Sequence, residues 1–405
     1  MLLALLPVPN KLSHISAKTD MQIRERNADV LHKALATILQ PLEAAGKEGV
    51  SLECADKCIR QCYPVLAAWI ADHIEYAKLF HLKKQACPVC TVEDHQLGAD
   101  SRPFYPARHY NKYYKRYLLL NSIESGSNTE KNETITFFDN QRVKPYFNVF
   151  WHLPRVRPER LHTPDLLHGI YLGLLKHLMD WVEPFLKKHD RLQGFDAVWK
   201  NLPHYPGFNR PRKAYREVSQ WQGKELRALG RAILVALAAS LGMPSITQQQ
   251  PFHQALQCVR NLIDFHLMAQ YRSHTPETLD YMDAYLNEFH RMKHVFLEFR
   301  VSKRAAELMK DSVKQLHEQH GQMATSSQHP TAAKRRRMEA ENRSKELDLR
   351  ESIIREESHF NFIKMHLPWH YREHVERLGS IRAYSTEVSK TAHRTKVKDG
   401  YRASN

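Results

Sequence analysis

Residues 161–186 read LHTPDLLHGIYLGLLKHLMDWVEPFL, and they are followed by FDAVWKNLPHYPGF (195–208) and VSQWQGKELRALGR (218–231). Apolar residues recur in these segments every three or four positions, which is the spacing of one face of an α-helix. Aspartate, histidine, tryptophan and glycine recur among the apolar residues, and this pattern is more specific than the packing of an ordinary core helix requires. The sequence therefore predicts a helical region from Leu161 to about Leu241, broken by a turn rich in Pro and Gly at 202–211.

The rest of the chain alternates further helical patterns with polar segments. Residues 21–45 place a row of apolar side chains on one helical face, and further helices are expected at about 253–271 and 277–300. The apolar run YPVLAAWIA (63–71) fits either a buried strand or the first turns of a helix, because periodicity does not separate the two in so short a run. Residues 318–350 are polar and dense in charge, which predicts a disordered basic linker.

The composition is that of a globular protein with an excess of basic residues. Of the 405 residues, 42% are hydrophobic and 26% are charged, which is enough for a sizeable core and for two or three domains. The chain has 60 Lys and Arg residues against 44 Asp and Glu residues, a net charge of +16. Such an excess favours the binding of polyanions such as nucleic acids, because each neutralised phosphate releases condensed counterions. The alternative is a basic surface that binds no particular partner.

Cysteine content and hydropathy limit the cellular compartments in which this protein is expected. Six cysteines in 405 residues are too few for a disulfide framework, which argues against a secreted scaffold and for a reducing compartment. The opening MLLALLP has no basic flank and its apolar run ends at Pro7, so it does not fit a signal peptide. No apolar stretch approaches the length of a membrane span, so we expect an intracellular protein without a membrane partner.

The segments from 161 to 231 resemble the central part of Plavaka-type transposases, a fungal, CACTA-like and KDZ-related family of cut-and-paste DNA transposon enzymes. The resemblance runs over most of the chain. It implies an α/β (α+β) fold: an incomplete ribonuclease-H-like core interrupted by a large all-α insertion, in a chain that is predominantly helical overall. The expected domains are a partial core with the CPVC segment at 1–120, a helical insertion at 121–317, the basic linker at 318–350 and the C-terminal part of the core at 351–405.

The resemblance also implies the DDE type of active site, in which three carboxylates hold two divalent metals about 3.5–4 Å apart. The segment CADKCIRQCYPVLAAWIADHIE (54–75) resembles the family's second-acid segment and places that acid at Asp72, with Glu75 close behind and Asp56 as the alternative. A plain surface or capping carboxylate is the other interpretation of Asp72.

The third acid of the family is expected near the end of the chain. The segment GSIRAYSTEVSKTAHRTKVKDGYRASN (379–405) resembles the family's closing segment and places this acid at Glu387. A glutamate at the start of a helix, favoured there by the helix dipole, is the other interpretation.

The first acid of the family lies upstream of the segment that MLLALLPVPNKLSH (1–14) resembles, so the resemblance implies that this chain begins after it. Asp20 opens a predicted helix that it can cap, and it is not expected to serve as the missing ligand. A site that lacks one of three carboxylates leaves the metal charges undercompensated, so we expect hydrolysis to fail. Mg²⁺ or Mn²⁺ is expected only where the site is completed.

The motif TPDLLHG places Asp165 and His168 one helical turn apart on the same face. Several DDE superfamilies carry such an aspartate and histidine between the second and third acids. The implied role is an imidazole that orients a metal-bound carboxylate or contacts a phosphate. Thr163 and Pro164 before the aspartate also suit a helix entrance, so Asp165 can be a capping residue, and both roles can hold together.

The motif Cys87-Pro-Val-Cys90 supplies two thiolates at a spacing typical of half a Zn²⁺ site. The family carries such a motif after its second acid, which supports zinc. The two further ligands are sought among neighbouring side chains: His95, His109, His152, His162, Cys58 and Cys62. Two buried reduced cysteines are one alternative and a redox pair is another, although no βαβ context supports the latter. His366, His370 and His374 recur every four residues and are interpreted as an amphipathic packing face.

Basic residues give the candidate DNA contacts. The stretch RHYNKYYKRY (108–117) interleaves tyrosines with basic residues, which suits base stacking and phosphate contacts, but a helix with inward tyrosines and solvated lysines explains it too. The candidates for DNA contact are Lys112, Lys115, Arg116, Lys176, Arg227 and Arg231. The run KRRR (334–337) fits a nuclear import signal or a solvated charge cluster, and the nucleus is the expected location.

Three functions therefore compete. The first is a truncated or domesticated Plavaka-type transposase derivative that binds DNA, either transposon ends or DNA in general, but cannot cleave it alone. The second is an active transposase whose gene model misses its first exon. The third is a helical scaffold that keeps the fold for protein contacts only, and each of the three allows a homo-oligomer.

Overall fold

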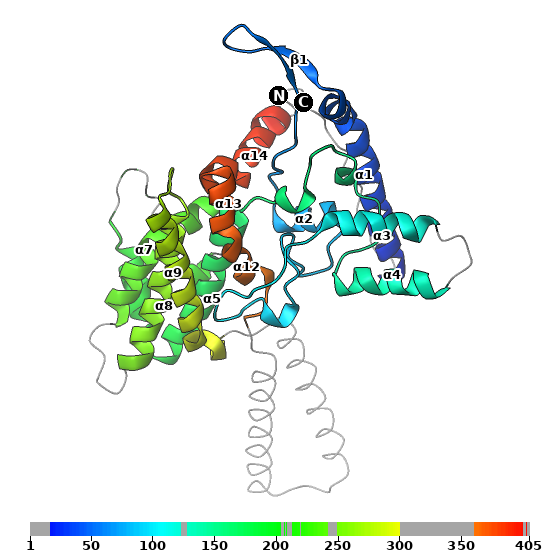
Figure 1. Ribbon diagram of the computed structural model, residues 1–405. Helices are drawn as coiled ribbons and strands as arrows, with labels where there is room; N and C mark the ends of the chain where they lie inside the picture. The colour runs from blue at the N-terminus through cyan, green and yellow to red at the C-terminus, as the bar shows by residue number, and fades with distance from the viewer. Residues whose placement is uncertain are drawn as a thin grey trace, which may run out of the picture.

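The computed structural model describes residues 17–122, 128–203, 206, 208, 213–218, 220–241, 249–299, 360–399 and 402, and this part of the chain is predominantly helical (Figure 1). Its α-helices are α1 (Ala17–Glu48), α2 (His73–Leu79), α3 (Tyr110–Ser122), α4 (Asn128–Asn140), α5 (Lys176–Lys188), α6 (Leu192–Lys200), α7 (Gly223–Leu241), α8 (Gln249–Met268), α9 (Pro276–Met292), α12 (Ile363–His366), α13 (Tyr371–Leu378) and α14 (Thr386–His393). The predicted linker and its KRRR run lie outside the described residues.

Shorter helical segments connect these helices. Two of them are π-helical, η4 (Leu166–Leu175) and η10 (Arg394–Lys398). The others are 3₁₀ turns: η1 (Asp94–Gln96), η2 (Val149–Trp151), η3 (Pro158–Arg160), η5 (Tyr215–Glu217), η7 (Lys293–Phe299), η8 (Leu367–His370) and η9 (Ile381–Tyr384). The wide π-helix η4 continues directly into α5, and together they form the helix that the pattern at 161–186 predicts.

Within the described residues, the only sheet is an antiparallel hairpin of β1 (Val50–Glu53) and β2 (Ile59–Cys62), which projects at the top of Figure 1. The prediction of a predominantly helical chain is thus confirmed, whereas the described residues do not show the mixed sheet of a ribonuclease-H-like core. The apolar run at 63–71 is neither strand nor helix: it is extended and makes a single parallel bridge, between Trp69 and His162.

Most of the helices C-terminal to Leu166 share one hydrophobic core, which forms the lobe at the left of Figure 1. Helices α8 and α9 pack closely as a pair, and α5, α6 and α7 complete the lobe. Trp181, Trp199 and Trp221 are buried in this core. Trp151 packs against the second core.

The second core joins α1, α2, α3 and η2 on the other side of the molecule. Leu35 and Leu39 of α1 point into it, and α1 already includes Asp20, so this residue lies within the helix and not at its expected start. Tyr110 and Tyr113 are buried here while Lys112 and Lys115 are exposed. The packing interpretation of this tyrosine-rich helix is therefore confirmed.

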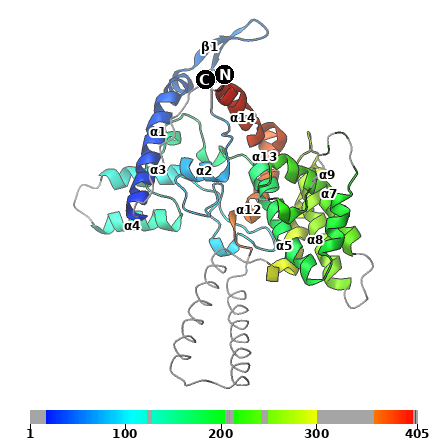
Figure 2. The same ribbon diagram turned by 180° about the vertical axis from the view of Figure 1, so that it is seen from behind.

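The segment from α12 to α13 lies between the two lobes in both views (Figures 1 and 2). Ile363 and Leu367 pack with the CPVC turn in a small third cluster. Gly98 lies so close to Phe360 that an added Cβ would come within 2.5 Å of the Phe360 backbone. This segment therefore binds the two halves of the chain together. None of the helices in the described ranges has the length and apolar character needed to cross a membrane.

Candidate functional site

The CPVC turn is held in place by its own neighbours. The Cys87 thiol accepts the Val89 N–H (3.4 Å), and Cys90 forms an isolated bridge with Ala107. Arg108, of which only 1% is exposed, donates from Nε to the Cys87 carbonyl (2.5 Å). Tyr110 donates to the Pro88 carbonyl (3.3 Å), so the first buried tyrosine of the basic stretch supports the cysteine turn.

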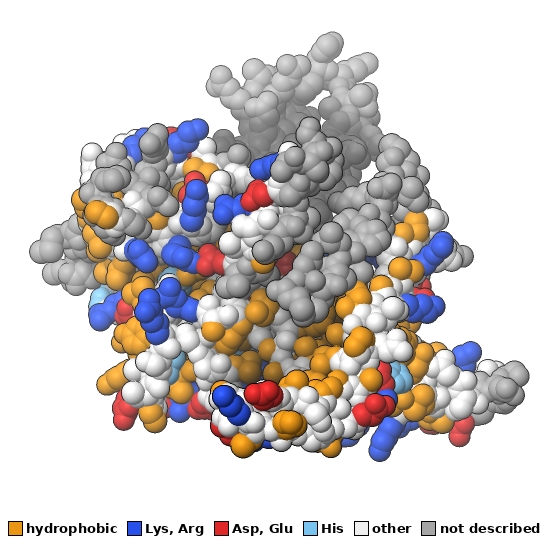
Figure 3. Space-filling view, turned by 90° about the horizontal axis from the view of Figure 1, so that it is seen from above, with side chains coloured by type: hydrophobic (Ala, Val, Ile, Leu, Met, Phe, Trp, Pro, Cys, Tyr) orange, Lys and Arg blue, Asp and Glu red, His pale blue; other side chains and the backbone are white. Residues whose placement is uncertain are grey.

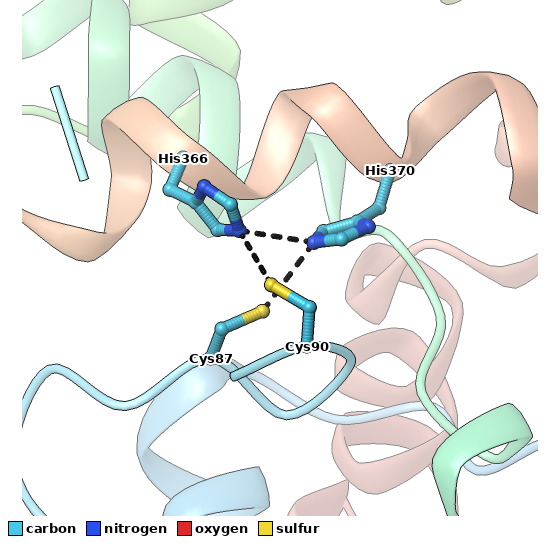
Figure 4. Close-up of side chains that lie close together, drawn as sticks. All are labelled: Cys87, Cys90, His366 and His370. Atoms are coloured by element: carbon cyan, nitrogen blue, oxygen red, sulfur yellow. Dashed lines mark hydrogen bonds between the residues drawn. The ribbon is translucent and has the colours of Figure 1, made fainter. Parts of the chain in front are cut away.

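His366 and His370 face this turn from the segment between the lobes (Figure 4). The Cys90 sulfur lies 3.1 Å from His366 Nε2, and the Cys87 sulfur lies 3.4 Å from His370 Nε2. The two Nε2 atoms are 3.0 Å apart, and all four candidate ligand atoms lie within 4.8 Å of one another. All four side chains are buried. The structure thus brings together residues that are separated by more than 270 positions.

The four side chains fit a tetrahedral zinc ion. With Zn–S near 2.3 Å and Zn–N near 2.0 Å, the edges of a Cys₂His₂ tetrahedron measure about 3.3–3.8 Å, close to the separations present. Without a metal, the pKa of Cys90 is raised by its hydrogen bond with Cys87 and by burial, so the pair does not become two free thiolates. A divalent cation can supply the positive charge that two buried thiolates require.

The histidines that face the cysteines are those that the sequence interpretation assigned to packing. They are buried, as that interpretation expects, but they point at the two sulfurs. Of the ligands proposed from the sequence, His95, His109 and His152 are exposed. Cys58 is exposed beside the hairpin. The four-residue spacing of His366 and His370 was visible in the sequence, but the sequence interpretation assigned it to packing and not to metal binding.

His162 and His374 form a second histidine pair next to this cluster. His162 Nδ1 lies 3.3 Å from His374 Nε2, and Arg377 donates to His374 Nδ1 (2.9 Å) and to the His162 carbonyl (3.3 Å). Burial lowers the pKa of His162 to about 3, and it also lowers the pKa of His374. Both rings are therefore neutral at neutral pH.

Asp165 is the most heavily hydrogen-bonded carboxylate of the predicted site. It caps η4 by accepting the N–H groups of Leu167 (3.1 Å) and His168 (3.0 Å). It also accepts from the Thr386 hydroxyl (2.8 Å), the Thr386 N–H (3.2 Å) and the Ser385 hydroxyl (3.4 Å). Burial raises the pKa of Asp165, but the hydrogen bonds from His168 and Thr386 outweigh burial and hold the pKa below its usual value.

His168 links this carboxylate to the last helix. Its Nδ1 donates to Asp165 Oδ2 (2.5 Å), and its Nε2 accepts from Lys390 of α14 (2.9 Å). Because an ammonium group only donates, the bond from Lys390 identifies Nε2 as the unprotonated nitrogen. The predicted aspartate–histidine pair thus exists, and it joins the start of η4 to α14, the helix that carries Glu387.

Glu387 forms an ion pair with Arg227 of α7. The Arg227 guanidinium also lies over the Tyr171 ring, 4.9 Å from its centroid. Burial lowers the pKa of Arg227, but Tyr171 and Glu387 outweigh it and raise the pKa above its ordinary value. The predicted third acid therefore stands beside Asp165 and His168, but a protein cation occupies its carboxylate.

Asp72, the predicted second acid, lies at the start of α2. Its side chain caps α2 by accepting the Glu75 N–H (2.8 Å). Burial and Lys176 lower the pKa of Lys364, whereas Asp72 and Asp165 both act to raise it, so the two carboxylates lie within electrostatic range of one ammonium. The alternative second acid, Asp56, is exposed beside the hairpin and pairs with Arg60.

The candidate DNA contacts fall into two places. Lys112, Lys115 and Arg116 are exposed on α3, and Lys176 is paired with Asp180 at the start of α5. Arg227 and Arg231 lie on α7, in the same lobe as Lys176 and not in the lobe that holds α3. Figure 3 shows Lys and Arg side chains gathered on the side of the molecule that carries α7 to α9. The structure therefore does not unite the candidate basic residues in one patch.

Comparison with known proteins bears on the first part of the chain, which holds Asp72, the CPVC turn and the Asp165–His168 pair. Residues 1–182 match the family model of the Plavaka transposase. This match confirms the resemblance that the sequence predicts. No curated protein matches the chain. Arg227, His366, His370 and Glu387 lie beyond the residues matched to the Plavaka family, and the structure alone places them beside the matched residues.

Proposed function

We propose that this chain is a transposase-derived, DNA-binding protein of the Plavaka type that acts on nuclear DNA and does not cleave it unaided. The observation that carries the proposal is the meeting of Asp165 and His168, from the part similar to the Plavaka transposase, with Glu387 and the basic residue Arg227. Carboxylates beside cations suit a phosphodiester and its metal ions better than they suit a scaffold without ligands.

The proposed lack of cleavage rests on how the carboxylates are engaged. Asp165 accepts hydrogen bonds from the backbone and side chains of two segments, Glu387 pairs with Arg227, and Asp72 caps a helix. A catalytic pair of Mg²⁺ or Mn²⁺ ions requires carboxylate oxygens that are free to coordinate. In this arrangement neither predicted acid, Asp72 or Glu387, has both carboxylate oxygens free of protein partners, and both oxygens of Asp165 accept hydrogen bonds. We propose that a ribonuclease-H-like active site was the ancestor of this arrangement.

An active DDE transposase is the second candidate. It is favoured by Lys364, whose pKa both Asp72 and Asp165 act to raise, because the predicted second acid and the carboxylate of the aspartate–histidine pair then lie in one electrostatic neighbourhood. In this case DNA and metal ions together would have to displace the protein partners of Asp165 and Glu387.

We further propose that Cys87, Cys90, His366 and His370 hold a structural Zn²⁺ ion. The support is a complete set of four buried N and S donors, which is typical of structural zinc and not of Mg²⁺ or Mn²⁺. When bound, the ion would fasten the segment between the lobes to the turn after α2. The chain's own residues would thereby keep α14, and with it Glu387, next to Asp165.

One pair of assays on the zinc-loaded chain tests the two candidate functions. Binding to a labelled DNA duplex should be saturable and should weaken steeply as salt rises. A supercoiled plasmid incubated with Mn²⁺ should stay intact. Nicking that is lost in both Asp72→Asn and Glu387→Gln would establish the active transposase in place of the inactive derivative. The absence of any DNA binding would leave the helical scaffold.

A further inference from the structure

A small polar cavity is lined by Glu387, the predicted third acid, and lies apart from the cluster of Cys87, Cys90, His366 and His370. Its volume is about 180 Å³, below the range of about 300–1,000 Å³ that is typical of pockets for drug-sized ligands. Eight residues from η4, α7 and the segments after α8 and α13 line it: Leu166, Tyr171, Arg227, Arg231, Gln270, Arg382, Ser385 and Glu387. A cavity of this size suits a single ionic group.

The charge of the lining is positive. Three arginines stand against one carboxylate, that of Glu387. In the described parts of the chain, Arg231 and Arg382 have no acidic partner within ion-pair distance. Arg227 keeps a buried Nε without a hydrogen-bond acceptor among the residues described. The guanidinium groups therefore retain donors that a ligand could use.

The remaining polar groups of the cavity are already committed. The Tyr171 hydroxyl donates to Gln270 (3.0 Å), and the Gln270 amide lies against the buried His266. Burial, together with Arg227 and Arg231, lowers the pKa of His266 to about 3, so this ring is neutral and does not add to the charge. The arginines alone therefore decide which ligand the cavity favours.

We propose that this cavity binds one phosphate group of a nucleic-acid strand through Arg227, Arg231 and Arg382. Guanidinium groups match the oxygens of a phosphate with paired N–H donors, which a spherical anion such as chloride does not use. The choice of a nucleic acid as the source rests on the proposed function; the affinity for the phosphate group itself does not.

The proposal gives Glu387 a second role. Its carboxylate occupies Arg227 in the absence of phosphate, so an incoming phosphate competes with it for the same guanidinium. When phosphate binds, the carboxylate is released toward Asp165 and His168. Phosphate binding would thus free the predicted third acid at the moment when DNA arrives.

Calorimetric titration of the zinc-loaded chain with inorganic phosphate, at ionic strength matched with sodium chloride, tests the site. Phosphate should bind, and Arg231→Ala and Arg382→Ala should each weaken binding about ten-fold, because a hydrogen bond to a charged group is lost. Lys200→Ala, which removes an exposed cation at the end of α6, should leave the affinity unchanged. Circular dichroism of each variant confirms that the fold is kept.

Glu387→Gln tests the competition, because it removes the carboxylate that occupies Arg227. Removal of the competing carboxylate should tighten phosphate binding about five-fold, the equivalent of one partly exposed ion pair. Unchanged or weaker binding by Glu387→Gln would overturn the competition. No binding of phosphate beyond that of chloride would overturn the site.

A short single-stranded oligonucleotide with a 5′-phosphate identifies the source of the phosphate. Added in excess, it should abolish the phosphate titration. A titration that persists would overturn the nucleic-acid source while the site itself stands. Binding of a labelled duplex by the Arg231→Ala, Arg382→Ala double variant is measured alongside. If the unaltered chain binds the duplex but does not bind phosphate, the cavity proposal fails and the proposed function survives.

Discussion

Loss of the proposed zinc ion should remove a link between the two halves of this protein. The length of chain between its ligands sets the size of the expected fall in Tm. The change considered is Cys87→Ser, which keeps the shape of the side chain but removes one of the four candidate ligands. Cys87 and His370 are 283 positions apart in the chain. A link between them through one ion therefore closes a very long loop in the unfolded state as well as in the folded one.

The loop length gives the magnitude. Closing a flexible loop of this length costs about (3/2)RT ln n, or about 5 kcal/mol, so a link that persists in the unfolded chain removes about this much entropy cost from folding. Unfolding entropies near 2.1 cal/mol/K per residue, applied to the whole chain, convert this free energy into a fall in Tm of about 6 °C. Partial detachment of the ion on unfolding would change the size of the shift but keep its direction.

The assay compares metal content and thermal unfolding in matched variants. The purified chain should contain one zinc per molecule, and Co²⁺ in its place should give the visible absorption of a tetrahedral thiolate site. Cys87→Ser should lose the metal and melt about 6 °C lower. Cys58→Ser, which changes an exposed thiol outside the cluster, should alter neither. A zinc-free wild-type chain, or equal melting of the two variants, would refute the reasoning.

Three further changes test the rest of the structure by thermal or chemical unfolding. Asp165→Asn should lower the free energy of unfolding by about 3 kcal/mol, because Asp165 accepts hydrogen bonds from two segments and the Asn side chain replaces one accepting oxygen with an NH₂ donor. Asp29→Asn on the surface should lower it by less than about 1 kcal/mol. Equal losses in the two variants would contradict this prediction. Burial lowers the pKa of His81 to about 3, so its contribution to stability is complete above about pH 6.5 and declines as pH falls toward 3; His81→Gln should flatten that decline, and an unchanged profile would contradict the assignment. Gly98→Ala should destabilise by about 1–3 kcal/mol and Gly194→Ala should not, since an added Cβ meets backbone at 2.5 Å in the first case and nothing nearer than 3.8 Å in the second; a neutral Gly98→Ala would contradict the close approach.

The sequence predicts this structure well where the information is local. The helix over 161–186 and the helices α8 and α9 follow from apolar spacing, and the start of η4 at Asp165 follows from its capping pattern. The run at 63–71 fails this test, because its extended form depends on one bridge to His162 and not on its own periodicity.

The candidate site is divided in the same way. The CPVC turn and the Asp165–His168 pair are visible in the sequence, since each lies within one turn of the chain. The contacts of His366 and His370 with the cysteines are not visible, because they cross most of the chain and depend on how α12 packs between the lobes. A four-residue histidine spacing around a proline is as compatible with packing as with metal binding, so only the fold distinguishes the two.

The pairing of Glu387 with Arg227 shows the same limit. Both residues were candidates, one as an acid and the other as a DNA contact, and nothing in the sequence joins them. In the structure they form one ion pair at the edge of a cavity with two further arginines. The sequence can therefore identify a site residue from its own segment, but it does not identify the residue with which that side chain pairs.

Equilibrium binding of a fluorescently labelled duplex to the zinc-loaded chain across a series of salt concentrations is the most direct test of the proposed function. Because the three cavity arginines together take one phosphate, the plot of log K against log salt should be linear with a slope at least as steep as about −0.9. Binding that is absent, or that does not change with salt, would contradict the assignment of this chain to DNA.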